Sequence, residues 1–302
     1  METVDKVAGD RRYSLSAHAF QAPPLEPGLY IVSTPIGNLG DITVRALETL
    51  AAATLIACED TRVTSTLTHR FGLKAQLLPY HEHNAEKQRP RLLAALERGE
   101  AIALVSDAGT PLVSDPGYRL VRDVLAEGHK VIPIPGASAP LAALVASGLP
   151  SDTLVFAGFL PQKGGPKTSR LNELAGIKAT LAFFESPHRV GATLKLMAEM
   201  LGGEREAIVA RELTKRFETF ERGSLEDLAT RFDGEQVKGE IVILVGPPED
   251  RPEAEGADAD ELLREALADM PVSAAAKKVA KATGLDRGDL YKRALELKDG
   301  AA

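Results

Sequence analysis

The chain has 302 residues, of which 44% are hydrophobic, so it can bury a sizeable core and divide into two α/β domains with an appendage. No apolar run approaches the roughly 20 residues of a membrane helix, and the first 27 residues lack the apolar centre of a signal peptide, so we expect a cytoplasmic protein. The single cysteine, Cys58, excludes an internal disulfide and argues against a metal site. A net charge of −7 gives no overall basic surface for a nucleic acid.

Residues 1–27 combine charged residues and prolines with little periodicity, which predicts a flexible leader. From Gly28 onward, apolar stretches typical of strands alternate with amphipathic stretches typical of helices. We expect strands at 29–32, 54–57, 101–106 and 131–134, and helices at 43–53, 62–71, 89–98 and 118–127. This alternation predicts an N-terminal α/β domain over residues 28–149, with a mostly parallel sheet covered on both faces.

A Gly-Leu-Pro break at residues 148–150 marks the start of a second α/β domain, which we expect to span residues 150–247. Its strands are predicted at 153–158, 180–185, 207–211 and 240–246, with a helix at 190–200. Residues 248–260 are rich in Pro, Glu, Asp, Ala and Gly and predict a linker.

A helical accessory module is expected over residues 261–302. Ser273 can cap a helix that runs to about Thr283, Gly284 breaks it, and Asp286 can cap a second helix that ends near Lys298. Two helices joined by so short a turn resemble a helix-turn-helix.

Five loops that follow predicted strands carry small residues, acids and hydroxyls. They are 33–41, 106–111, 133–139, 184–189 and 211–215. Ligands of open α/β sheets bind at the carboxyl ends of the strands, where Asp107 would suit a cation such as the sulfonium of S-adenosylmethionine. A dinucleotide-binding protein remains an alternative, because Glu59 and Asp60 lie about 20 residues after the Gly37 loop, where an acid that binds a nucleotide ribose would be expected.

Two groups of basic residues stand out against the acidic background. Residues 161–170 hold Lys163, Lys167 and Arg170 without an acid. Between Val272 and Lys298, seven basic residues face three acids, a local net charge of +4. Both groups can neutralise phosphates, although a charged stretch is also compatible with a simple solvated face.

The five loops, in this order, resemble the ribosomal RNA small subunit methyltransferase I family of the tetrapyrrole methylase superfamily over residues 28–247, and the terminal module resembles that family's accessory domain. The resemblance implies two α/β domains with S-adenosylmethionine in the cleft between them, usually in a homodimer. It also implies an enzyme that methylates the 2'-oxygen of a cytidine in 16S rRNA, in free RNA or in the small ribosomal subunit.

Carried over residue by residue, the resemblance implies cofactor contacts at Ile36, Asp107, Gly109, Thr110, Val113, Ser138, Ala139, Glu185 and Leu213. The small-molecule branch of the superfamily has Gly-Asp-Pro where residues 109–111 read Gly-Thr-Pro, so the contact of Thr110 stays open. A general base is sought among Glu185, Glu212, Lys215, His81 and His83. RNA contacts are expected at Lys163, Lys167, Arg170, Lys277, Lys278, Lys281, Arg287, Lys292 and Arg293.

Three other functions compete with this interpretation. A methylase of a tetrapyrrole precursor would share the fold but have no use for a basic terminal module. A dinucleotide-dependent oxidoreductase would bind its nicotinamide cofactor at the Gly37 loop. A non-catalytic RNA-binding factor would need no cofactor pocket.

Overall fold

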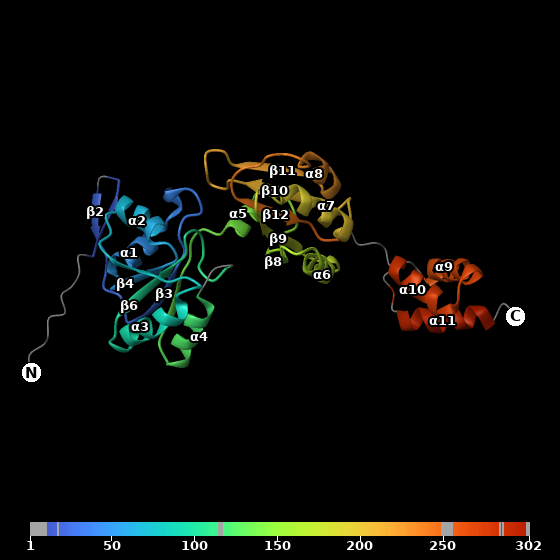
Figure 1. Ribbon diagram of the computed structural model, residues 1–302, viewed down its shortest axis with the longest axis horizontal. Helices are drawn as coiled ribbons and strands as arrows, with labels where there is room; N and C mark the ends of the chain where they lie inside the picture. Colours follow the sequence, from blue (N-terminus) through green and yellow to red (C-terminus); the bar gives the residue numbers. More distant parts are fainter. Residues whose placement is uncertain are drawn as a thin grey trace, which may run out of the picture. The chain divides into compact units, whose positions relative to one another are not determined.

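A computed structural model describes residues 11–16, 18–113, 117–248, 256–283, 285 and 287–299. By its internal contacts the chain forms two compact units, residues 1–248 and residues 249–302, and each is described by itself (Figure 1). No helix in the described ranges is long and apolar enough to cross a membrane.

The first sheet of the larger unit is entirely parallel, as the sequence predicts. Its strands are β3 (Gly28–Val32), β4 (Leu55–Cys58), β5 (Gln76–Pro79), β6 (Ala101–Val105) and β7 (Val131–Ile134), in the order β5-β4-β6-β3-β7. Every residue of β4 and β6 is buried, which is typical of strands covered on both faces. Because all five strands run the same way, their carboxyl ends lie at one edge of the sheet.

Helices cover both faces of this sheet (Figure 1). They are α1 (Val44–Ala52), α2 (Thr61–Arg70), α3 (Ala85–Glu97) and α4 (Tyr118–Ala126), and a 3-10 turn η1 (Leu39–Asp41) precedes α1. On one face Leu47 and Leu50 of α1 join the core, and on the other Leu92 of α3 packs with Leu120 of α4. Thr43 begins α1 by accepting a hydrogen bond from the backbone of Ala46 at 3.1 Å. The predicted two-sided sheet is confirmed.

The second sheet is mixed. It contains β8 (Leu154–Phe159), β9 (Thr180–Glu185), β10 (Glu206–Arg211), β11 (Thr219–Ser224) and β12 (Ile241–Val245), in the order β11-β10-β12-β9-β8. Only β8 and β9 pair in parallel. Both β9 and β10 run antiparallel to β12, so the carboxyl ends of β8, β9 and β10 meet at the edge where β12 begins.

Four helices belong to the second sheet. They are α5 (Ala139–Val145), α6 (Gly164–Ala175), α7 (Val190–Leu201) and α8 (Leu225–Arg231). Leu171 of α6, Leu194 of α7 and Leu228 of α8 share one core, and Ala143 and Leu144 of α5 belong to the core on the other face. The sheet is therefore also covered on both sides.

The expectation of a flexible leader needs a correction. Arg12–Leu15 (β1) and His18–Gln21 (β2) form an antiparallel hairpin, while residues 1–10 lie outside the described ranges. Tyr13 is buried in the first core and stacks on Phe20 with 5.4 Å between ring centroids. The backbone N–H of Ser14 donates to the carbonyl of Phe71 at 2.8 Å. Tyr13 and Ala22 are buried in the first core and Leu15 packs against it, contacts of single side chains that periodicity does not reveal.

The smaller unit is a bundle with three helices in its described part. They are α9 (Gly256–Asp269), α10 (Val272–Thr283) and α11 (Arg287–Asp299). The helices expected around Ser273 and after residue 286 are confirmed, and α9 was not expected. It begins inside the range 248–260 that the composition assigns to a linker, because Leu263 and Ala266 pack into the core of the module with Val279 and Leu290. Residues 249–255 of that predicted linker lie outside the described ranges.

Candidate functional site

A cavity of about 380 Å³ lies among the strand-end loops of both sheets in the larger unit. Eight of the nine positions where a cofactor contact is predicted line it: Ile36, Gly109, Thr110, Val113, Ser138, Ala139, Glu185 and Leu213. They come from five loops that are far apart in the sequence. The fold therefore brings these positions together around one space.

The lining of this cavity is mostly small and apolar. Among the described residues that line it, only Glu185 and Glu240 are charged, and each is paired with a cation, Arg189 or Lys215. An apolar wall with a few polar groups fits a nucleoside such as that of S-adenosylmethionine. The described lining holds no lysine or arginine, which disfavours the pyrophosphate of the dinucleotide alternative.

Hydrogen bonds tie three loops of the first sheet together at the cavity. Thr34 and Gly109 exchange backbone hydrogen bonds of 2.8 and 3.1 Å. The hydroxyl of Thr110 donates to the carbonyl of Ala137 at 3.2 Å and lies 2.9 Å from the hydroxyl of Ser33. Since a hydroxyl has one proton, Ser33 donates to Thr110. The hydroxyl of Thr110 therefore holds neighbouring loops in register, and its contact with the cofactor stays a prediction.

Replacing Thr110 with valine is expected to weaken cofactor binding about tenfold. The substitution keeps the shape but leaves the carbonyl of Ala137 and the hydroxyl of Ser33 without this partner, which costs on the order of 1–2 kcal/mol. Titration calorimetry with S-adenosylhomocysteine measures the effect. Thr110→Ser, which retains the hydroxyl, is the control and should bind within about twofold of the wild type. Equal affinities for the valine and serine variants would contradict the assigned role.

Glu185 is almost completely buried at the end of β9, and only 3% of it is exposed. One carboxylate oxygen accepts from the backbone of Ser186 at 2.7 Å and from the Arg189 guanidinium at 2.8 Å. The other accepts from the hydroxyl of Thr193 at 2.7 Å, and that hydroxyl lies 3.2 Å from the Nζ of Lys167. Both carboxylate oxygens are therefore engaged at the wall of the cavity.

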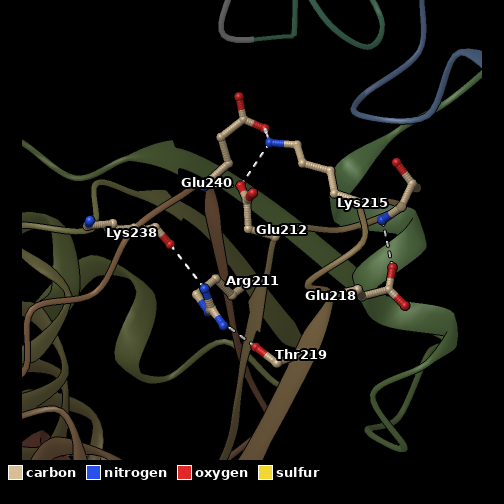
Figure 2. Close-up of polar contacts among 8 residues, drawn as sticks. Arg211, Glu212, Lys215, Glu218, Thr219, Lys238 and Glu240 are labelled. Carbon is tan, nitrogen blue, oxygen red and sulfur yellow. Dashed lines mark hydrogen bonds and ion pairs between the residues drawn. The ribbon is translucent and has the colours of Figure 1, made fainter.

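The loop after β10 carries a lysine held between two carboxylates (Figure 2). The Nζ of Lys215 lies 2.8 Å from Glu212 and 3.0 Å from Glu240. Glu212 also accepts from the backbone of Glu240 at 3.0 Å, and the backbone of Thr214 donates to Glu218 at 2.6 Å. These contacts join the end of β10 to the start of β12, beside Leu213 at the cavity.

The hydrogen bonds around Lys215 explain the shifted pKa values of Glu212 and Lys215. The hydrogen bond from Lys215 holds the pKa of Glu212 below its usual range. Burial alone would lower the pKa of Lys215, but its hydrogen bonds to Glu212 and Glu240 outweigh burial and raise it. At neutral pH Glu212 is ionised and Lys215 is protonated, so Lys215 cannot accept a proton from a substrate.

Replacing Glu212 with glutamine is expected to lower the free energy of unfolding by about 1 kcal/mol at pH 7, because the pair with Lys215 is lost. A carboxyl with a lowered folded pKa contributes stability above its unfolded pKa of about 4.3 and loses it as the pH falls through the folded value. The difference between variant and wild type should therefore shrink below about pH 4. Urea denaturation across pH measures it, and a difference that does not change with pH would contradict the pairing.

Asp107 and the two candidate histidines lie elsewhere. Asp107 does not line the cavity but a separate shallow depression, together with Asp60, His81 and His83. It accepts from the backbone of Asp60 at 3.0 Å, while hydrogen bonds from Arg62 lower the pKa of Asp60 to about 2. No group of three or more His, Cys, Asp and Glu residues able to hold a metal ion occurs in the described ranges.

Some residues predicted to contact RNA form ion pairs within the protein, and others do not. Arg170 pairs with Glu173 at 2.9 Å. In the terminal module Arg293 binds Asp260 at 2.6 Å and Glu296 at 2.8 Å, and Lys292 lies 3.5 Å from Asp289. The exposed residues Lys163, Lys277, Lys278 and Arg287 have no ion-pair partner among the described residues. The surroundings of the Lys281 side chain lie outside the described ranges.

Sequence reasoning missed several residues of the cavity. Phe159 lines it from β8, and residues 239–242 line it from the start of β12, whereas Phe184 begins one of the five predicted loops. The predicted positions lie in loops that follow strands, whereas β12 runs antiparallel to its neighbours and reaches this edge with its first residues. The Lys-Gly pair before the strand predicted at 240–246 is the signal that could have revealed it.

The sequence matches two family models. Residues 28–229 match Tetrapyrrole (Corrin/Porphyrin) Methylases, and residues 253–298 match the RsmI C-terminal HTH domain. Ribosomal RNA small subunit methyltransferase I of Mesorhizobium japonicum is 57% identical over 92% of this chain and 95% of its own length. The chain belongs to the ribosomal RNA small subunit methyltransferase I family. Members from Erythrobacter litoralis and Escherichia coli O157:H7 are 53% and 45% identical over 93% and 89% of this chain, and 99% and 94% of their own.

Solved structures show the same fold for the family's two α/β domains. A cobalt precorrin-4 methyltransferase aligns with a TM-score of 0.57 at 21% identity, over 72% of this chain and 94% of its own. A uroporphyrin-III C-methyltransferase from Thermus thermophilus, complexed with S-adenosylhomocysteine, aligns with a TM-score of 0.52 at 21% identity, over 72% and 97%. The predicted fold class, two α/β domains of the tetrapyrrole methylase type with a terminal helical module, is confirmed.

Proposed function

We propose that this chain transfers a methyl group from S-adenosylmethionine to the 2'-oxygen of a cytidine in 16S rRNA. The observation that carries the proposal is the cavity lined by eight of the nine positions where the family resemblance implies cofactor contacts. The curated relatives are named ribosomal RNA small subunit methyltransferases, which supports ribosomal RNA as the acceptor.

The proposed reaction forms a bond between the 2'-oxygen and the methyl carbon while the sulfonium–carbon bond breaks, so that S-adenosylhomocysteine leaves and the hydroxyl proton passes to solvent water. The cofactor supplies the electrophilic methyl group. The chain would hold it between the loops tied by Thr110 and the wall formed by Glu185. Alignment of two reactants can supply on the order of 7 kcal/mol or more of the barrier reduction.

Both oxygens of Glu185 accept hydrogen bonds within the protein, and Glu212 and Lys215 are bound to each other, which favours a structural role over that of a general base for these three candidates. We propose that all three are positioning residues, and that orientation of the hydroxyl provides most of the rate. The pH dependence of kcat would then be insensitive to Glu212→Gln between pH 6 and 8, although KM for the cofactor would rise.

The proposal is tested with methyl-labelled S-adenosylmethionine and small ribosomal subunits that lack ribose methylation, with free 16S rRNA in parallel. Label recovered on a cytidine 2'-oxygen after nuclease digestion is the expected result. Transfer to a tetrapyrrole precursor, with none to either RNA substrate, would overturn the assigned acceptor while keeping the fold. Absence of transfer to every acceptor would overturn the activity itself.

The double substitution Lys277→Glu and Lys278→Glu in α10 is expected to weaken RNA binding without unfolding the terminal module. Both side chains are exposed, and neither has an ion-pair partner in the described part of the chain. Losing two phosphate contacts should reduce the slope of log affinity against log salt by about 2. Arg293→Ala is the contrasting variant, because its pairs with Asp260 and Glu296 predict a loss of module stability. If the slope of log affinity against log salt did not change in the double variant, α10 would not belong to the RNA-binding surface.

We also keep the domain boundaries as proposals: an N-terminal α/β domain over 28–149, a second over 150–247 and a helical module that starts at 256 rather than 261, because α9 begins there. The two sheets on either side of Gly148 support the first division.

A cytoplasmic homodimer is proposed from the family resemblance, and sedimentation equilibrium of the full chain tests the dimer.

A further inference from the structure

An irregularity in β8 turns an aromatic side chain toward the cavity. The register of β8 against β9 shifts between Phe156 and Gly158, so Ala157 is the extra residue of a bulge. Gly158 has a φ of +65°, in the left-handed region that favours glycine. Without the bulge, Phe156 and Phe159 would point to opposite faces, but with it both rings contact Phe184, at centroid distances of 4.9 and 5.4 Å.

Phe159 is nevertheless poorly covered. It lines the cavity, yet 56% of its surface is exposed. Phe184 beside it is partly buried and belongs to the core on this face of the sheet. An exposed ring fixed by a bulge and by a neighbouring ring offers a rigid, flat apolar surface, which is the kind of surface on which a nucleobase stacks.

The segment that follows Phe159 has the charge that a nucleic acid strand requires. Residues 161–170 contain no acid, and Lys163 at the start of α6 is exposed without an ion-pair partner among the described residues. Lys167 and Arg170 differ, because Thr193 and Glu173 engage them. An aromatic platform followed closely in the sequence by an exposed cation is the combination that single-stranded RNA sites use.

We propose that Phe159 stacks on a base of the RNA acceptor strand, at or next to the methylated nucleotide, and that Lys163 contacts the adjoining phosphate. This inference rests on the proposed function, because it needs RNA as the acceptor. It assigns Phe159 to the acceptor, within the same cavity that Gly109 and Ser138 line, where cofactor contacts are predicted.

The first test separates KM for the acceptor from affinity for the cofactor. Phe159→Leu removes the aromatic face but keeps apolar bulk, and it should raise KM for small ribosomal subunits about 5- to 150-fold. Its affinity for S-adenosylhomocysteine should stay within about twofold of the wild type. Phe159→Tyr keeps the ring and should restore KM to within a few-fold. A cofactor affinity that falls in parallel with KM, or a KM that does not change, would overturn the inference.

The second test uses a property of the composition, since the protein contains no tryptophan. Phe159→Trp places a single fluorophore at the platform, and S-adenosylhomocysteine alone should leave its emission unchanged. Strong quenching would put the cofactor's adenine on this ring and overturn the inference. Phe20→Trp on the hairpin, where the native side chain is 44% exposed, is the matched control. If the wild-type protein methylated no RNA, the proposed function would be wrong. If RNA methylation were unaffected by Phe159→Leu, this inference alone would be wrong.

Discussion

Replacing Glu185 with alanine is expected to lower the free energy of unfolding by about 3 kcal/mol and to weaken binding of S-adenosylhomocysteine by at least tenfold. Removing one partner of a buried ion pair leaves the other uncompensated, and here Arg189, Thr193 and the backbone of Ser186 all lose their acceptor. Because Glu185 lines the cavity, rearrangement of these groups alters the cavity wall. Urea denaturation and titration calorimetry measure the two effects.

Glu173→Ala is the matched control, because the pair of Glu173 with Arg170 is largely exposed and contributes only about 0–1 kcal/mol. Glu185→Gln should be intermediate, since it keeps the shape and an acceptor oxygen but not the charge. If Glu185→Ala proved no less stable than Glu173→Ala, the hydrogen bonds of Glu185 would not contribute the stability expected of them.

Replacing Gly37 with alanine is expected to weaken cofactor binding about 10- to 100-fold. A Cβ atom at this position would lie 2.5 Å from Cγ of Lys215 and 2.9 Å from the backbone carbonyl of Leu213. Overpacking of this kind typically costs 1–3 kcal/mol, which corresponds to the expected loss of affinity. To remove the clash, the loop after β10 has to move away from the first sheet. Because Leu213 lines the cavity, such a movement opens its wall.

Gly176→Ala at the end of α6 provides the control. Nothing lies within 4 Å of the added methyl group, and its φ of −88° suits any residue, so binding and stability should match the wild type. Titration calorimetry with S-adenosylhomocysteine again gives the readout. A Gly37→Ala protein that binds as tightly as Gly176→Ala would show that the two loops are not in contact in solution.

The sequence was sufficient for elements with strong periodicity or continuous burial, and insufficient for those held by tertiary contacts. β4 and β6 are apolar throughout and were predicted within one residue at either end. β11 was missed, because it is an edge strand whose Glu221 and Arg222 give no apolar alternation. The sequence alone likewise does not determine the directions of β10 and β12, since pairing is decided by the whole sheet.

For the candidate site, the family resemblance predicts nine cofactor contacts, of which eight line the cavity and Asp107 does not. Asp107 looked like a ligand for a cation, yet its carboxylate binds the backbone of Asp60. Arg293 looked like a phosphate contact, yet it joins α11 to Asp260 of a helix that was not predicted. Such partners come from distant segments, so no local pattern reveals which charged side chains are already engaged.

The loop that carries Lys215 contains two residues other than glycine in the left-handed region, Glu212 at a φ of +53° and Thr214 at +64°. Such conformations cost of order 1 kcal/mol or more each and persist only where the surroundings enforce them. The loop therefore loses its conformational entropy when the chain folds, and not when the ligand binds. Cofactor association should consequently show a small conformational entropy penalty, at the expense of a less stable apoprotein.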